Sequence, residues 1–246
     1  MTDTATGAPV PILLAFSGGL DTSFCVPWLA ATYGRPVVTV TVNTGGIGPE
    51  DAVRLEQRAV ALGAVDHLLV DARQEYFDRV LRWLLIGGVR RGNLYPLCVG
   101  AERSIQAQTV ARVAKEFDTT TIAHGCTAAG NDQVRFEVAL RTLAPGLEIL
   151  APVRDRAFKR PEQLAFLEER KLPVPPYGAA YSTNRGLWGV TIGGKETLTS
   201  AGSIPESAWV LSKDAWTNPR QPLRITLGFD RGVPASLTGV ALDPVP

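Results

Sequence analysis

The chain has 246 residues, of which 45% are hydrophobic and 20% charged, proportions typical of a folded globular protein with one large domain or a large and a small one. The formal net charge of +1 gives no reason to expect binding to nucleic acid or to a membrane surface. No apolar run approaches the roughly 20 residues of a membrane span, and residues 1–7 lack the basic-then-apolar order of a signal peptide. We therefore expect a cytoplasmic protein.

The first part of the chain alternates short apolar runs with helical patterns. Strands are expected at 11–16, 35–42 and 67–70, and helices at 21–33, 49–62 and 74–85. The alternation repeats with helices at 101–117, 131–142 and 161–172, and strands at 119–124 and 147–151. This order predicts an α/β fold, a parallel sheet with helices on both faces. Ligands of such sheets bind beyond the carboxyl ends of the strands.

The composition changes after residue 172, where Gly, Pro, Ser and Thr become frequent and helical patterns become few. Strands are expected at 188–191, 224–229 and 236–242. We therefore divide the chain into a larger α/β domain over 1–168 and a smaller, β-rich segment over 169–246.

The three cysteines, Cys25, Cys98 and Cys126, include no CxxC pair. This spacing predicts neither a disulfide framework nor a zinc site. It also argues against sulfur-transfer enzymes of the kind that use paired cysteines.

A run from Ala15 to Ser23, with the letters AFSGGLDTS, lies between an expected strand and an expected helix. Its glycines let the backbone approach an anion closely, and the helix start presents free N–H groups. The run lacks the Gly-Lys-Ser/Thr ending of a Walker A loop. It matches instead the SGGxDS-type loop of the ATP pyrophosphatases, which cleave ATP between the α and β phosphates. The alternative is a well-capped strand-to-helix turn.

A second run of small residues, HGCTAAGNDQVRFE over 124–137, follows an expected strand and leads into an expected helix. Asn131 and Arg135 lie four residues apart and share a helical face. Arg135 offers a planar fork for a carboxylate, and Asp132 offers a negative charge for an α-amino group. With Thr127, this set suits amino-acid zwitterions. The alternative is a helix capped by Asn131 with a solvated acid and base.

These two runs resemble the argininosuccinate synthase family, which carries AxSGGLDTS and HGxTxxGNDQVRFE. Further agreement lies in Tyr95-Pro96, in APVRD over 151–155, and in Tyr181-Ser182 followed by LWG over 187–189. The resemblance extends over residues 11–246 and implies that residues 1–168 form the nucleotide-binding domain and residues 169–246 part of the substrate-binding domain. It implies an ATP-dependent ligase of arginine biosynthesis that joins citrulline and aspartate through a citrullyl-AMP, releasing AMP and pyrophosphate. ATP would bind as its Mg²⁺ complex, and neither a resident metal nor a covalent nucleophile is implied.

The resemblance implies a role for each matched position. ATP binding is implied for Ala15, Phe16, Ser17, Gly18, Gly19, Leu20, Asp21, Thr22, Ser23, Val42 and Gly125. Citrulline binding is implied for Tyr95, Gly100, Asn131, Arg135, Ser182 and Thr191. Aspartate binding is implied for Thr127, Asn131 and Asp132. Two roles stay open: Asp21 positions the metal or loop or is a first-turn acid, and His124 approaches the nucleotide or is structural.

The sequence departs from the family pattern at several positions. Ala128 and Ala129 stand where the family loop has Gly-Lys, and Gly100 and Thr191 stand where it has serines. Family members continue past 232–237 with a Glu and a Tyr that contact citrulline and a helix used in tetramer assembly. The expected partner is thus a second copy or a chain that supplies this part. The alternatives are a truncated, partner-dependent or inactive ATP-binding homologue, and an AMP-forming ligase for another ureido or amide substrate.

Overall fold

The computed structural model of the chain describes residues 9–246 apart from 129–130, 177–180, 213–214 and 216–220. The chain divides into two compact units whose segments alternate along the sequence. The first unit comprises residues 1–42, 48–70 and 106–177, and the second comprises residues 43–47, 71–105 and 178–246. The domain boundary expected between residues 168 and 169 stays a prediction. In the described part of the chain, no helix is long and apolar enough to cross a membrane.

A five-stranded sheet forms the centre of the first unit. Its strands, in the spatial order β3-β2-β1-β4-β5, are β3 (Asp66–Asp71), β2 (Val37–Asn43), β1 (Ile12–Ala15), β4 (Thr121–His124) and β5 (Glu148–Leu150). β1 pairs in parallel with β2 and with β4, and β4 pairs in parallel with β5. Strands buried on both faces read as nearly continuous apolar or β-branched runs, as β1 and β2 do. The predicted parallel sheet is confirmed.

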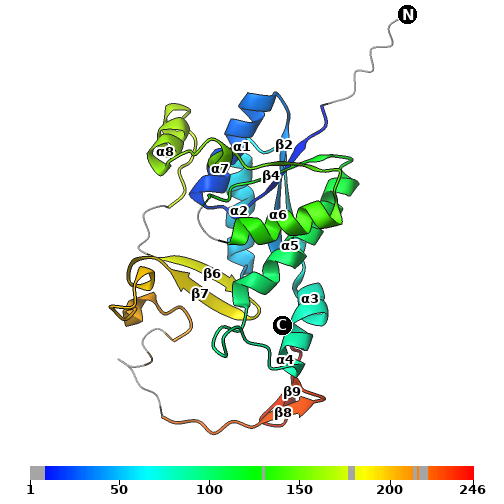
Figure 1. Ribbon diagram of the computed structural model, residues 1–246, viewed down its shortest axis with the longest axis vertical. Coiled ribbons are helices and arrows are strands. Elements are labelled where there is room, and N and C mark those ends of the chain that lie inside the picture. The colour runs from blue at the N-terminus through cyan, green and yellow to red at the C-terminus, as the bar shows by residue number, and fades with distance from the viewer. Residues whose placement is uncertain (1–8, 129–130, 177–180, 213–214, 216–220) are drawn as a thin grey trace, which may run out of the picture. The chain divides into compact units, whose positions relative to one another are not determined.

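Helices cover both faces of this sheet (Figure 1). One face packs against α1 (Leu20–Tyr33), α2 (Pro49–Ala61), α7 (Pro152–Asp155) and α8 (Arg160–Glu169). The other face packs against α5 (Cys98–Glu116) and α6 (Asp132–Leu143). Leu14 belongs to the first core and its neighbour Leu13 to the second, because successive side chains of a strand point to opposite faces. The alternating elements of the sequence therefore form a doubly wound sheet.

The second unit contains a helical stretch and two small antiparallel sheets. The helix predicted at 74–85 is observed as three consecutive segments, α3 (Arg73–Tyr76), the π-helical turn η1 (Phe77–Leu81) and α4 (Arg82–Ile86). The hairpin consists of β6 (Ser182–Gly186) and β7 (Gly189–Gly193), and the 3₁₀ turns η2 (Lys195–Leu198) and η3 (Glu206–Ala208) follow. The three-stranded sheet consists of β8 (Leu227–Asp230), β9 (Val233–Leu237) and β10 (Val240–Ala241).

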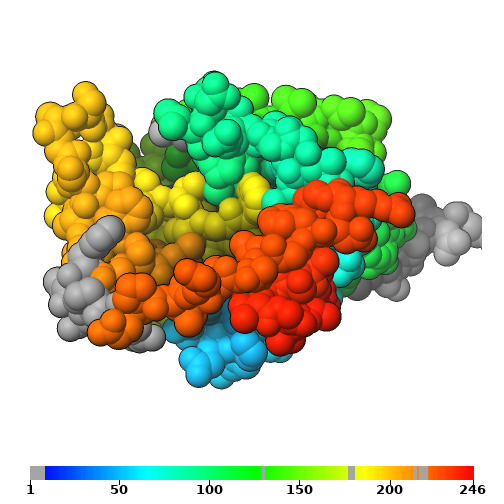
Figure 2. All heavy atoms as spheres, turned by 90° about the horizontal axis from the view of Figure 1, so that it is seen from below, coloured from blue at the N-terminus to red at the C-terminus, as the bar shows by residue number. Residues whose placement is uncertain are grey.

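The single strand predicted at 236–242 is wrong. The chain reverses there, because Thr238 and Gly239 both adopt positive φ angles, 50° and 82°, as a type I′ hairpin turn requires. Leu237 and Val240 then face each other as an antiparallel pair. Residues 221–246, orange to red in Figure 2, lie on the surface of their unit.

Phe24 of α1 offers a test of the first core. Its ring is 1% exposed and meets the edges of Phe158 and Phe166 at centroid distances of 4.9 and 5.1 Å. Phe24→Ala should lower the free energy of unfolding by about 3–5 kcal/mol, because a cavity replaces these contacts. Urea denaturation measures this loss. Tyr33→Ala, at a site on the same helix that is 42% exposed, should cost much less, and equal losses in the two variants would contradict this core.

Candidate functional site

The two loops singled out in the sequence follow neighbouring strands. Ala15 at the end of β1 is in register with His124 at the end of β4. In the sheet, β2 and β3 lie on one side of β1, and β4 and β5 lie on the other. The direction in which successive strands are added therefore switches between β1 and β4. In doubly wound sheets this switch point is where ligands bind. The phosphate loop after β1 and the second loop after β4 thus open at the same edge of the sheet.

The phosphate loop leads directly into α1. Gly18 has a φ of +71°, a conformation that L side chains rarely adopt, and Gly19 caps the helix without a side-chain hydrogen bond. The first N–H groups of α1 therefore have no partner within the helix. The hydroxyl of Thr22 donates to the carbonyl oxygen of Gly19 at 3.2 Å and lies 3.2 Å from the hydroxyl of Ser17. The loop is thus a preformed cradle of N–H and hydroxyl donors, as an anion requires.

Gly125 brings the second loop against this cradle. A Cβ atom at Gly125 would lie 3.0 Å from the backbone nitrogen of Thr22 and 3.1 Å from the carbonyl carbon of Asp21. Because these neighbours are backbone atoms at a helix start, they cannot rotate away as a side chain can. The absence of a side chain at Gly125 therefore permits direct contact between the second loop and the phosphate loop.

Arg58 of α2 contacts the phosphate loop, and the sequence patterns did not single it out. Its guanidinium donates to the carbonyl oxygen of Gly18 at 2.5 Å. Burial, followed by the nearby Arg54, lowers the pKa of Arg58. A cation at this point adds positive potential beside the loop. No local sequence pattern indicates this contact, because Arg58 and Gly18 are 40 positions apart.

Asp21 has a partner within the first unit. The side-chain amide of Gln163, in α8, donates to its carboxylate at 2.9 Å, and Gln163 is 1% exposed. This contact ties the first turn of α1 to α8 and supports the loop-positioning alternative for Asp21. A metal-positioning role stays a prediction. Among the described residues, no group of three or more His, Cys, Asp or Glu side chains is placed to hold a metal ion.

The start of α6 carries the predicted amino-acid-binding residues. Arg135 donates to the carboxylate of Asp132 at 2.9 Å, so the two charges form an ion pair. Asn131 occupies the N-cap position but makes no capping hydrogen bond through its side chain. Thr127 is exposed. A zwitterion bound here would replace the bond between Asp132 and Arg135 with its own contacts to the two side chains. Ala129, one of the two departures in this loop, lies outside the described residues.

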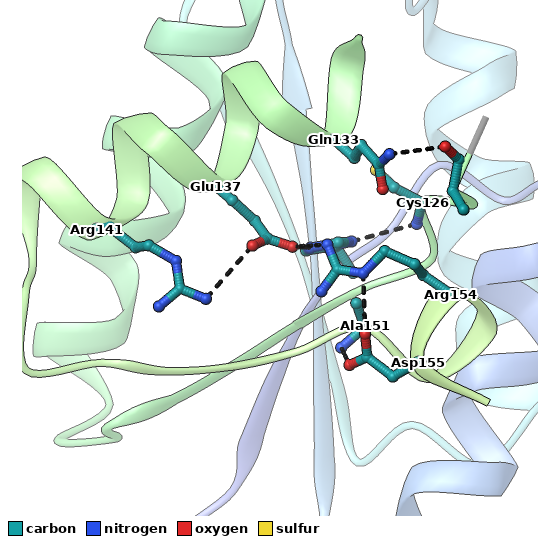
Figure 3. A network of polar contacts seen from close by, with 9 residues as sticks. Cys126, Gln133, Glu137, Arg141, Ala151, Arg154 and Asp155 are labelled. Atoms are coloured by element: carbon teal, nitrogen blue, oxygen red, sulfur yellow. Dashed lines mark hydrogen bonds and ion pairs between the residues drawn. The ribbon is translucent and has the colours of Figure 1, made fainter. Parts of the chain in front are cut away.

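His124 is buried behind the second loop. It is 2% exposed, its Nε2 lies 3.0 Å from the carboxylate of Glu137, and its Nδ1 accepts the backbone N–H of Cys126 at 3.2 Å. Burial lowers the pKa of His124, opposed in part by Glu137. Glu137 also binds Arg154 of α7 (Figure 3). These contacts favour the structural alternative for His124.

The remaining predicted citrulline residues belong to the second unit. The hydroxyl of Tyr95 accepts the backbone N–H groups of Val99 and Gly100, at 3.1 and 3.3 Å. The N–H of Gly100 is therefore engaged by another residue of the predicted set. Ser182 and Thr191 lie on the β6–β7 hairpin, where Ser182 pairs with Gly193. Since alternate residues share a face, Ser182 and Thr191 are on the same face of the hairpin.

A tryptophan joins two of the family-like stretches inside the second unit. The indole N–H of Trp188 donates to the carbonyl oxygen of Pro96 at 2.6 Å. This bond holds the β6–β7 turn against the Tyr95-Pro96 segment. No local sequence pattern indicates this bond, because its two residues are 92 positions apart.

The family model of the arginosuccinate synthase N-terminal HUP domain matches residues 11–173, about two thirds of the chain. The chain belongs to the argininosuccinate synthase family. The match covers both loops and the sheet that carries them.

Curated relatives agree with this argininosuccinate synthase assignment. The argininosuccinate synthase of Metallosphaera sedula is 37% identical over 95% of this chain, and that of Methanocaldococcus jannaschii is 36% identical over 95%. The Pyrobaculum aerophilum argininosuccinate synthase is 37% identical over 93%. The aligned regions cover 59%, 58% and 57% of these three relatives. The chain thus spans less than two thirds of their length, and the roles of individual residues stay predictions.

Gly125→Ala tests the contact between the two loops of this argininosuccinate synthase homologue. The added methyl group would press on the backbone of Asp21 and Thr22 and displace one loop. We expect ATP affinity to fall about tenfold, with a loss of about 1–3 kcal/mol in stability. Isothermal titration with ATP measures the affinity. Gly146→Ala is the matched control, because a Cβ atom there meets nothing within 4 Å. Unchanged ATP affinity in Gly125→Ala would refute the contact.

Proposed function

We propose that this chain is an ATP-dependent C–N ligase of the argininosuccinate synthase type. The observation that carries the proposal is the approach of Gly125 to the start of α1, where a Cβ atom at Gly125 would lie 3.0 Å from the nitrogen of Thr22. It supports one site in which a nucleotide on the phosphate loop lies beside an amino acid on the second loop. Family membership supports the same reaction type.

The reaction has two steps. The ureido oxygen of citrulline attacks the α-phosphorus of ATP, the bond to the β-phosphate oxygen breaks, and pyrophosphate leaves with its Mg²⁺. The amine of aspartate then attacks the ureido carbon of the citrullyl-AMP, the C–O bond to AMP breaks, and the amine loses a proton. Products are argininosuccinate, AMP and pyrophosphate. Alignment of the attacking atom and phosphorus can lower the barrier by roughly 7–11 kcal/mol without a covalent nucleophile.

The proposed division of roles follows the two loops. The N–H groups from Gly18 to Thr22 stabilise charge on the leaving pyrophosphate, as preorganised donors do. Asp132 holds the α-amino group of aspartate, with Thr127 and Asn131 as neutral partners. Arg135 holds the carboxylate of citrulline with its planar fork. Citrulline binding by Tyr95, Gly100, Ser182 and Thr191 is proposed on the strength of the family resemblance alone.

Citrulline-dependent exchange of labelled pyrophosphate into ATP tests the proposal. The purified chain with Mg²⁺, ATP and citrulline should catalyse exchange, because the first step is reversible and needs no aspartate. Omitting citrulline is the control and should abolish exchange. ATP binding without exchange would favour the rival, a partner-dependent ATP-binding homologue. Exchange that requires a different ureido or amide compound in place of citrulline would favour the second alternative, an AMP-forming ligase for another substrate.

Asp132→Asn should weaken aspartate binding about tenfold, the loss expected for one charged hydrogen bond, while ATP binding stays intact. Titration of aspartate into the chain saturated with an unreactive ATP analogue measures this. Asp78→Asn is the matched control, because it also breaks a helical Asp–Arg pair, Asp78–Arg82 at 4.0 Å. Equal aspartate affinity in wild type and Asp132→Asn would remove Asp132 from the site.

A further inference from the structure

Glu137 joins three elements of the first unit at one carboxylate. One oxygen contacts Arg154 of α7 and lies 3.0 Å from Nε2 of His124, at the end of β4. The other oxygen lies 3.4 Å from Arg141, one turn further along α6. Figure 3 shows Arg141 and Arg154 reaching Glu137 from opposite sides. The Glu137 side chain is only 13% exposed. None of the expected substrate contacts involves this residue, although it lies within the family-like run.

The hydrogen bonds determine which nitrogen of His124 carries the proton. The backbone N–H of Cys126 is a donor, so Nδ1 of His124 must be an unprotonated acceptor. Nε2 then carries the hydrogen and donates to the carboxylate of Glu137. The imidazolium form would place an Nδ1–H against the N–H of Cys126. The geometry therefore requires neutral His124 with its proton on Nε2.

The surrounding charges keep Glu137 ionised and able to accept this bond. Burial alone would raise the pKa of Glu137, but hydrogen bonds from Arg154 and His124 lower it below its usual value. Arg154 is held in turn by Asp155, at 2.9 Å, and Asp155 accepts the N–H of Ala151 at 3.3 Å. The charged groups facing His124 are thus Glu137 from α6 and Arg154 and Asp155 from α7.

The bond to Cys126 acts on the residue that follows Gly125. Cys126 lies between Gly125, which packs on the start of α1, and Thr127, which belongs to the predicted aspartate set. The hydrogen bond from the Cys126 N–H to His124 therefore restrains the second loop in the middle of the Gly125–Thr127 stretch. Ala128 is held separately, because its carbonyl oxygen accepts the side-chain amide of Gln133 at 2.9 Å.

We propose that Glu137 is a positioning residue that orients the second loop through His124. Its carboxylate selects the Nε2–H tautomer, and Nδ1 of that tautomer fixes the backbone of Cys126 beside the phosphate loop. The expected effect on substrate binding rests on the proposed function. The tautomer of His124 does not depend on it. A hydrogen-bond partner of one ring nitrogen fixes which nitrogen carries the proton and how the ring of a histidine is oriented.

Nitrogen-15 NMR of the ring nitrogens tests the proposal in the ligand-free chain. The sequence has two histidines, and His67→Asn assigns the signals of His124 by elimination. In the wild type, Nδ1 should show the shift of an unprotonated nitrogen and Nε2 that of a protonated one. In Glu137→Gln, which keeps the size of the side chain, both signals should move toward the average of two tautomers, and amide exchange at Cys126 should quicken about tenfold.

Glu116→Gln is the matched control, because Glu116 pairs with Arg112 at 3.6 Å on an exposed face of α5. It should leave the His124 signals and the Cys126 exchange rate unchanged. Arg154→Gln is a second variant, which leaves the acceptor in place and should produce a smaller shift of the same signals. A wild-type ring pattern and exchange rate at Cys126 in Glu137→Gln would overturn the proposal.

Aspartate titration of the same samples separates this inference from the proposed function. If wild type binds aspartate with an unreactive ATP analogue, Glu137→Gln should bind it more weakly with ATP affinity little changed. If wild type binds neither ligand, the proposed function fails, while the ring signals still decide whether Glu137 sets the tautomer.

Discussion

The structure depends on one close approach of backbone to backbone, that of Gly125 to the first turn of α1. A Cβ atom at Gly125 would be 3.1 Å from the carbonyl carbon of Asp21, so any larger residue would press on the start of α1 and displace one of the loops. Parallel pairing of β1 and β4 brings the loops to the same edge of the sheet. Under the proposed function, this contact sets how far apart a nucleotide on the first loop and an amino acid on the second can be.

Polar and charged groups behind the loops hold this arrangement from both sides. Arg58 binds the carbonyl oxygen of Gly18, and Gln163 binds the carboxylate of Asp21. Glu137 holds His124, which holds the second loop. Preorganisation of this kind matters for phosphoryl and adenylyl transfer, where alignment and fixed donors supply most of the rate enhancement. In this chain of the argininosuccinate synthase family, such contacts fix the geometry of both loops.

Sequence patterns predicted the sheet, its covering helices and both loops, because buried strands, helical periodicity and glycine-rich turns are local signals. The supporting contacts were not predictable in the same way. Asp21 and Gln163 are 142 positions apart, and their meeting depends on how α1 and α8 pack. The hairpin turn at Thr238 and Gly239 escaped notice because Thr-Gly is a weaker turn signal than Asn-Gly. Whether Thr127, Asn131 and Asp132 bind aspartate depends on ligand contacts that no local pattern contains.

A crystal structure with an unreactive ATP analogue and aspartate tests the central claim most directly. The account predicts phosphate oxygens within hydrogen-bonding distance of the N–H groups between Gly18 and Ser23. It predicts the α-amino group of aspartate at the carboxylate of Asp132, on the same edge of the sheet. Phosphates bound elsewhere, or aspartate bound without contact to the second loop, would contradict it.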